Sequence, residues 1–275
     1  MKYFFHILGL LLLLAFSSCT KNREYDLRPM LNTANDNILS QRPFHYGFFM
    51  LIKAALDTTL QHSHYAVIDG ASVCLDPSGK TYTFDFLDGT FCGDSVARYG
   101  SFSAFLDTNF FVKGAKARFT FIDYFEDSHR INGLFRIENT GLIAGGKLAF
   151  SSLIDSAVII KDSVHDIHWK GNMVYEVNQA SILSGPSQAI FSICGEGSGV
   201  SSMGFVFHNL ITDTLLNSLY CPWIKDGKIS LSLFEGDIRS GIIEFMGKSA
   251  CNDRVDYNFE GRVYHLWLKE SYLRK

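Results

Sequence analysis

Two glycine-containing stretches come closest to known catalytic motifs. A serine hydrolase places its nucleophile in Gly-x-Ser-x-Gly, on a tight turn between a strand and a helix. Residues 195–199 read Gly-Glu-Gly-Ser-Gly, which puts the serine one position late, in what we expect to be a loop between strands. Residues 247–249 match the end of a phosphate-binding loop, but the upstream glycine, Gly241, lies one residue too far away. Neither stretch predicts catalysis.

Histidines and carboxylates that could hold a metal ion are the next candidates. They are His62, His64, His165, His168, Asp85, Asp88 and Asp94. A zinc site needs a histidine pair together with further ligands, and no Cys-x-x-Cys or His-Glu-x-x-His motif supplies them. The three aspartates do not have the spacing of a calcium loop, and aspartate is common in turns in any case. We therefore expect no metal site and no cofactor.

The first 19 residues predict export and a lipid anchor. Lys2 gives a positive start, residues 4–16 form an apolar run, and Ser17-Ser18-Cys19 ends it. The run is shorter than the ~20 residues that a membrane span needs. The segment resembles bacterial lipoprotein signals, in which the cysteine thiol takes a diacylglycerol and the new amine takes an acyl chain. We expect residues 1–18 to be removed and Cys19 to be lipidated; in the alternative, an ordinary signal is cleaved and Cys19 is incidental.

Composition narrows the partners of the exported chain. The chain of 275 residues contains 25 Lys and Arg residues and 28 Asp and Glu residues, which gives a net charge of −3. Because this balance implies no large basic patch, we expect no nucleic-acid partner. Thr20 follows the cysteine where an inner-membrane retention signal would have Asp. The resemblance therefore implies an outer-membrane lipoprotein of the cell envelope, facing the periplasm or the cell surface.

Five cysteines remain after Cys19, and an oxidising compartment allows them to pair. We expect two local disulfides, with Cys194 left free. The predicted pairs join cysteines within one group of strands, and they are Cys74–Cys92 and Cys221–Cys251. The alternative is five reduced thiols, with Cys92 and Cys251 serving as small buried residues.

Three tryptophans are candidates for stacking on sugar rings, and they are Trp169, Trp223 and Trp267. The competing interpretation is that they pack in the core, since tryptophan is mostly buried on average. Sequence alone leaves both open.

Five tripeptides combine Asp, a hydroxyl residue and then an apolar residue or Thr. Their hydroxyl residues are Thr58, Ser95, Ser156, Ser163 and Thr214. The pattern resembles an acceptor motif of some bacterial envelope glycosylation systems, and average composition would give roughly one such tripeptide by chance. The competing interpretation is that Asp-Ser and Asp-Thr pairs favour turns. We predict O-glycosylation at these positions.

Hydrophobic periodicity divides the chain. Residues 19–43 are polar without a period and predict a flexible tether. Residues 44–62 form a short helix or a lead-in segment, with a strand as the alternative. From Tyr65 onward the period is two, as in Tyr82-Thr83-Phe84, and turn signals recur between the alternating runs. We predict an all-β fold, an antiparallel β-sandwich.

An internal echo suggests that the sandwich contains two related β-units. Residues 84–94 and 243–253 share the order apolar, acid, Phe, apolar, four residues, Cys, one residue, Asp. We expect a first unit over residues 63–150 and a second over residues 151–275. Coincidence between two amphipathic hairpins is the alternative.

The same motifs carry a family resemblance over Ser72 to Leu268. The stretches that carry it are residues 84–89 with Cys92, Arg98-Tyr99-Gly100, Asn139-Thr140-Gly141, Cys221-Pro222-Trp223 and Cys251-Asn252-Asp253. They resemble the motifs of uncharacterised bacterial all-β envelope lipoproteins. The chain departs from that pattern at Leu87 and at Gly247-Lys248. The resemblance implies the fold and the lipid anchor, and offers no known activity.

Taken together, these features predict a lipid-anchored envelope protein with a binding or structural role rather than a catalytic one. A glycan or another envelope protein would be its partner. The alternatives are a glycan-binding module and an envelope glycan hydrolase that uses loop carboxylates. With 28 acidic residues, the sequence nominates no catalytic pair.

Overall fold

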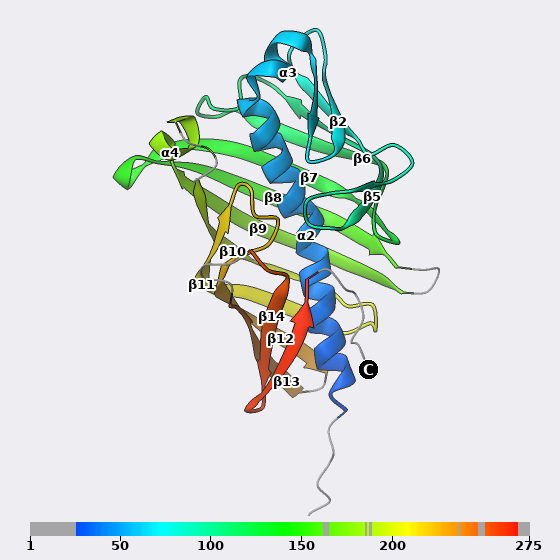
Figure 1. Cartoon of the computed structure of the whole chain (residues 1–275). Helices are drawn as coiled ribbons and strands as arrows, with labels where there is room; N and C mark the ends of the chain where they lie inside the picture. Colours follow the sequence, from blue (N-terminus) through cyan, green and yellow to red (C-terminus); the bar gives the residue numbers. More distant parts are fainter. Residues whose placement is uncertain are drawn as a thin grey trace, which may run out of the picture.

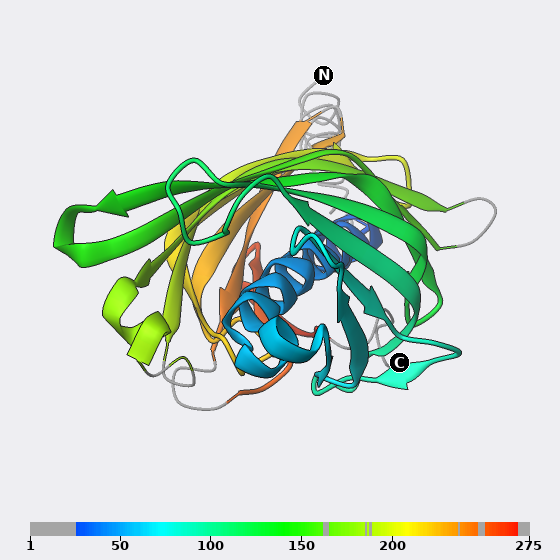
Figure 2. The ribbon, with the colours of Figure 1, turned by 90° about the horizontal axis from the view of Figure 1, so that it is seen from above.

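One long helix lies inside one strongly curled antiparallel sheet (Figures 1 and 2). The computed structural model describes residues 26–161, 165–184, 186, 189–235, 237–246 and 251–268. The helices are α2 (Arg28–Leu56), α3 (Thr58–Ser63), α4 (Gln179–Ser184) and the 3-10 turn η1 (Ala144–Gly146). The signal peptide expected at residues 1–18 and the lipidation site Cys19 lie outside the described residues.

The strands follow one another in chain order, and each pairs antiparallel with its neighbour. They are β1 (Tyr65–Ile68), β2 (Ala71–Leu75), β3 (Thr81–Asp85), β4 (Thr90–Phe91), β5 (Ala97–Leu106), β6 (Lys116–Glu126), β7 (His129–Ile143), β8 (Lys147–Ile160), β9 (Asp166–Asn178), β10 (Ile190–Val200), β11 (Val206–Ser218), β12 (Asp226–Glu235), β13 (Asp237–Phe245), β14 (Arg254–Phe259) and β15 (Arg262–Trp267). The short β4 pairs with β5 beside the main path. The predicted all-β antiparallel fold is confirmed. Its layering is sandwich-like, because opposite parts of the curled sheet face each other across α2 (Figure 2).

Helix α2 corrects the predicted tether. Residues 28–43, which we expected to be flexible, form the first half of a helix of 29 residues. The helix runs through Pro43, although a proline inside a helix costs about 3 kcal/mol. Burial offsets this cost, since Phe44 and Phe48 just beyond the proline are almost fully enclosed by the sheet. Several polar residues before Pro43 are also buried, which is why the segment lacks the one-sided pattern of a surface helix; they are Thr33, Asp36, Asn37, Ser40 and Gln41.

Aromatic packing attaches α2 to the middle of the sheet. The Phe48 ring stacks on Tyr175 of β9 with 4.1 Å between ring centroids, and it meets Phe150 of β8 edge-on. The Phe44 ring lies edge-on to Phe135 of β7 at 5.3 Å. Such pairs add about 0.5–1.5 kcal/mol each beyond the area they bury.

Bulges let the sheet curl around the helix. Register shifts interrupt the pairing of the long strands, for example between Tyr99 and Ser101 of β5. A bulge bends its strand and increases the local twist, so several bulges along the sheet produce curvature. Gly100 sits at the β5 bulge with φ +68, and a Cβ there would overlap the carbonyl oxygen of Asp123.

The sheet also crosses the predicted boundary between two β-units. The boundary between residues 150 and 151 falls inside β8, which pairs along its length with β7 and β9. The strands from β1 to β15 therefore belong to one continuous sheet. A common origin of the two halves stays a prediction.

We predict that Gly100→Ala destabilises the fold by about 3 kcal/mol or more, because strain at positive φ and a backbone clash act together. Gly145→Ala is the matched control, since Gly145 has φ +78 but, beyond its chain neighbours, no atom lies within 4 Å of the point that a Cβ would occupy. Its cost should be only about 1 kcal/mol. Urea unfolding measures both, and equal losses would contradict the role of the bulge.

Candidate functional site

A cavity of about 60 Å³ lies between α2 and the last third of the sheet. Its apolar wall comes from Phe49 and Met50 of α2, Ile229 of β12, Phe245 of β13 and Trp223 of the loop between β11 and β12. These side chains are buried, so the cavity is part of the interior. Enclosed apolar walls with a few polar groups are typical of small-molecule sites.

Three polar side chains in the cavity wall have an atom without a hydrogen-bond partner. These atoms are Gln41 Oε1 and His45 Nε2 on α2 and Asn217 Oδ1 on β11. All three residues are at least nine-tenths buried. Buried polar atoms nearly always have a partner in native proteins, so these three atoms make the cavity a candidate binding site.

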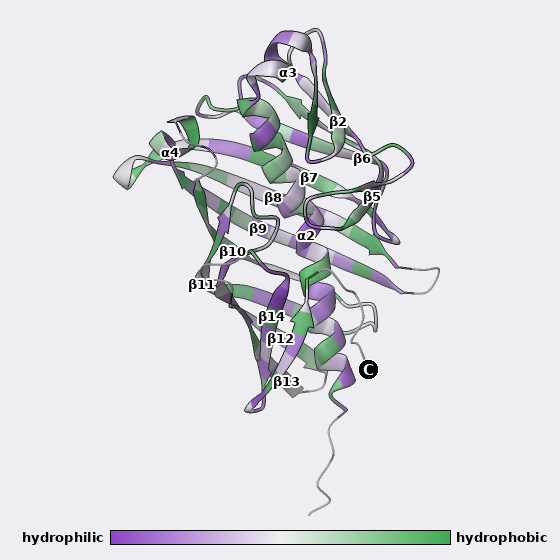
Figure 3. Cartoon of the chain, in the orientation of Figure 1, coloured by the Kyte–Doolittle hydropathy of each residue, from purple (hydrophilic) through white to green (hydrophobic). Residues whose placement is uncertain are grey.

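Gln41 and His45 belong to a polar stripe along α2, which we define as Thr33, Asn37, Gln41 and His45. Each member follows the previous one by four residues, so all four share one helix face. Each carries a buried polar atom without a partner. Hydrophobic and hydrophilic residues accordingly alternate along the enclosed helix (Figure 3). Sequence analysis missed this stripe, although its four-residue spacing could have revealed it.

Burial keeps the His45 imidazole neutral. Its Nδ1 is hydrogen-bonded to the hydroxyl of Tyr175 at 2.8 Å. Burial lowers the pKa of His45 to about 4. At neutral pH the ring is therefore uncharged.

A buried ionic network adjoins the cavity, and two of its members, Arg42 and Asp94, line the wall. Arg98 of β5 holds both carboxylate oxygens of Asp94 at 2.6 and 2.7 Å, and its Nε donates to Glu126 at 3.1 Å. Arg42 of α2 donates to the other oxygen of Glu126 at 2.8 Å. Burial alone would raise the pKa of Glu126, but Arg98 and Arg42 hold that pKa below its ordinary value. Glu126 therefore stays ionised between the two arginines.

Lys53 and Asp69 lie where the cavity meets the surface. Both residues line the cavity and also a surface groove of about 450 Å³ beside the start of α3. The Lys53 ammonium lies 5.5 Å from the centre of the Tyr220 ring. Burial lowers the pKa of Lys53. This groove gives the cavity an entrance with one positive and one negative group.

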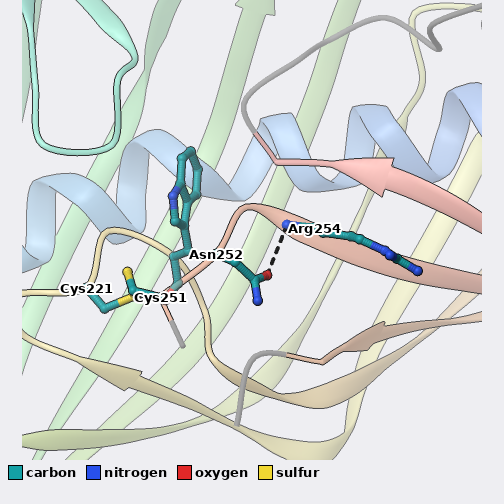
Figure 4. Close-up of a disulfide and its surroundings, with 5 residues drawn as sticks. Cys221, Cys251, Asn252 and Arg254 are labelled. Atoms are coloured by element: carbon teal, nitrogen blue, oxygen red, sulfur yellow. Dashed lines mark hydrogen bonds between the residues drawn. A yellow bond between two sulfur atoms is a disulfide. The ribbon is translucent and has the colours of Figure 1, made fainter. Parts of the chain in front are cut away.

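The predicted Cys221–Cys251 disulfide is confirmed (Figure 4), with 5.7 Å between the Cα atoms. Cys221 lines the cavity, and Cys251 precedes β14, where Asn252 accepts a hydrogen bond from the Arg254 backbone at 3.2 Å. The disulfide thus joins the loop that carries Trp223 to the residues that precede the last hairpin of the sheet.

The predicted Cys74–Cys92 disulfide is wrong, since both residues are free thiols. Cys74 of β2 points to the outer face and is exposed, whereas Cys92 is buried and accepts a hydrogen bond from the Tyr46 hydroxyl at 3.4 Å. Thiols on opposite faces of a sheet cannot reach bonding distance. Cys194 is also free, as predicted, and is exposed on β10.

The three tryptophans do not form a surface platform. Trp169 packs inside against Phe44 with 5.8 Å between ring centroids, Trp223 is buried in the cavity wall, and Trp267 alone is exposed. The inward ring of Trp169 also explains why positions 171 and 197 are glycines, because a Cβ at either position would lie 2.7 Å from the indole.

Residues 195–199, which we expected to form a loop, are part of strand β10.

The predicted glycosylation positions that the structure describes are all exposed. They are Thr58, Ser95, Ser156 and Thr214, whereas Ser163 lies outside the described residues. Ser95 and Ser156 adopt positive φ angles of 58° and 55°, which places them on sharply turned backbone. Their geometry fits the turn interpretation as well as the acceptor interpretation, so modification stays a prediction.

The described residues contain no group of three or more His, Cys, Asp or Glu that could hold a metal ion. His62 and His64 are instead hydrogen-bonded to the backbone carbonyls of Thr58 and Leu75, respectively.

No helix in the described part of the chain is long and apolar enough to cross a membrane. No known protein family, curated protein or solved structure matches this chain.

We predict that the free energy of unfolding falls by up to about 3 kcal/mol as the pH drops from 6.5 to 4, because of His45. The unfolded chain binds a proton on this residue near pH 6.5, whereas the folded chain binds it only near pH 4. His45→Gln should remove this part of the pH dependence, and His62→Asn on the exposed α3 should not. Urea titrations at several pH values measure the slope. An unchanged slope in His45→Gln would contradict the assignment.

Proposed function

We propose that this protein is a lipid-anchored envelope protein that binds a small, mostly apolar and uncharged molecule in the cavity beside α2. The observation that carries the proposal is the set of three buried polar atoms without a hydrogen-bond partner, on Gln41, His45 and Asn217, whose residues line that cavity. A purely structural interior would be expected to pair or exclude such groups.

The walls indicate the chemical class of the ligand. Aromatic and aliphatic side chains favour an apolar body, and the three unpartnered atoms favour a hydroxyl or amide group on it. A charged group deep in the cavity would find Arg42 and Asp94 already paired, so only Lys53 and Asp69 at the entrance could attract it. The cavity of about 60 Å³ admits only a few heavy atoms, so a larger ligand would extend into the entrance groove at Lys53 and Asp69.

The two alternatives from sequence receive less support. A glycan hydrolase needs two carboxyl groups that are free to exchange protons or attack the sugar. Of the two carboxylates in the cavity wall, Asp94 has both oxygens bound to Arg98. A glycan-binding module would need exposed aromatic rings, and Trp169 and Trp223 are buried. Binding without catalysis is therefore the function that we favour.

A simple alcohol tests the cavity. We predict that 1-hexanol binds saturably, changes the fluorescence of Trp223 and raises the melting temperature, since a ligand that binds only the folded state stabilises it. Ile229→Phe should fill the cavity and abolish both effects. Leu153→Phe, on the exposed face of β8, is the matched control and should leave both effects intact. Binding that survives Ile229→Phe would place the ligand elsewhere, and the absence of saturable binding would contradict the proposal.

Mass and detergent partitioning test the anchor. We predict that the native protein partitions into detergent and that Cys19→Ala abolishes both partitioning and cleavage before residue 19. Cys194→Ala, which removes another accessible thiol, should behave as the native chain does. Intact mass also tests the glycosylation hypothesis, because a mass equal to that of the lipidated polypeptide alone would contradict it. Normal partitioning of Cys19→Ala would contradict lipidation.

A further inference from the structure

An apolar row crosses the outer face of the sheet. Its residues are consecutive cross-strand partners, apart from His168, which lies between the first two valines. The members of this outer apolar row are Val158 (β8), Val200 (β10), Val206 (β11), Phe234 (β12) and Ile238 (β13). Val206, Phe234 and Ile238 are exposed, and Ile238 keeps 69% of its surface open. Directly opposed residues on neighbouring strands touch, so the four members from Val200 to Ile238 form one continuous apolar surface, and His168 separates Val158 from it.

Other exposed apolar residues on this face do not extend into a row. Leu153 of β8 lies between Arg136 and Asn172, and Leu134 of β7 lies opposite Asp155. Single exposed apolar residues of this kind are normal on protein surfaces, whereas a contiguous apolar surface marks an interaction site. A shallow groove of about 490 Å³ runs beside Val158, Val200 and Val206, so the surface there is hollowed as well as apolar.

The outer apolar row lies at the end of the fold where α2 begins. The turn that joins Val200 to Val206 is bound to the first turns of the helix: Asn32 donates to the sulfur of Met203 at 2.8 Å, and Asp36 accepts from the backbone and hydroxyl of Ser202 at 2.7 Å. Figure 1 shows the ends of β12 and β13 at this same end of the molecule.

The chain between the anchor and α2 is short. Cys19 precedes Arg28, the first residue of α2, by nine residues. Even a fully extended segment of that length spans only about 30 Å. A lipid on Cys19 would therefore hold the start of α2, and the strand ends attached to it, close to the bilayer.

From these observations we propose that the outer apolar row rests on the surface of the lipid bilayer to which the chain is anchored. This inference depends on the lipid anchor in the proposed function, but not on the cavity ligand. Apolar side chains gain free energy when they enter the boundary between headgroups and acyl chains, and they add to the binding that the lipid supplies. The row would fix the orientation of the fold on the membrane.

A tryptophan reporter tests the contact in the lipidated protein. Phe234→Trp places an indole in the row, and Phe105→Trp places one on the outer face of β5, where the native ring is equally exposed (42% against 43%). In vesicles of brominated phosphatidylcholine, Phe234→Trp should show quenching beyond that of the native tryptophans, and Phe105→Trp should not. Equal or absent quenching at the two positions would overturn the proposal.

A second measurement separates this surface from the anchor. The chain from residue 19 onward, expressed without residues 1–18 and with Cys19→Ala, should still bind phosphatidylcholine vesicles weakly, and Phe234→Ser with Ile238→Ser should reduce that binding about tenfold or more. Phe105→Ser is the control and should have no effect. If lipidation is absent but the row is correct, the native and Cys19→Ala chains will bind equally and both will respond to the serine variants. If the serine variants instead abolish self-association and leave vesicle binding unchanged, the row contacts a second copy of the chain and the membrane proposal fails.

Discussion

The enclosure of α2 by the sheet is the constraint on which the rest of the structure depends. The charged side chains of a helix cannot enter an interior without a large free-energy cost unless they find partners there. Arg42 meets this requirement by bonding to Glu126 and to the carbonyl of Leu268, so it joins the helix to the sixth strand and to the end of the described chain. Removing one partner of such a buried pair typically costs about 3–5 kcal/mol, because the remaining charge stays buried.

The cavity follows from the way the sheet encloses the helix. Bulges bend the strands around α2, but within the described residues β1 and β15 do not pair with each other, so the sheet does not close. The wall of the cavity combines strand residues, such as Ile229 and Phe245, with Trp223 of the loop between β11 and β12. The Cys221–Cys251 disulfide joins that loop to the residues before β14, so it holds part of the wall in place. The cavity therefore lies where a loop as well as the sheet packs on the helix.

Alternation along strands was readable from sequence, whereas burial of a polar helix was not. Tyr82 and Phe84 of β3 and Met173 and Tyr175 of β9 face inward as the period of two predicts, because one face of each strand is buried in the core. The polar stripe that includes Gln41 led to the prediction of a flexible tether, because the sequence does not show that a sheet encloses this segment. The same limit explains why one predicted disulfide was correct and the other was wrong. Proximity within a hairpin predicted both pairs, but the side-chain directions that keep Cys74 apart from Cys92 depend on the strand register, which the sequence does not show.

The length of α2 relates the two proposed surfaces to each other. The apolar row lies at the start of the helix, whereas Lys53, at the entrance of the cavity, comes 25 residues after Arg28. At 1.5 Å per residue, these points are about 38 Å apart along the helix axis. With the row on the bilayer, the entrance would lie well beyond the headgroups and face the aqueous compartment. A ligand would then arrive from water rather than from the membrane, which agrees with an entrance that carries both Lys53 and Asp69.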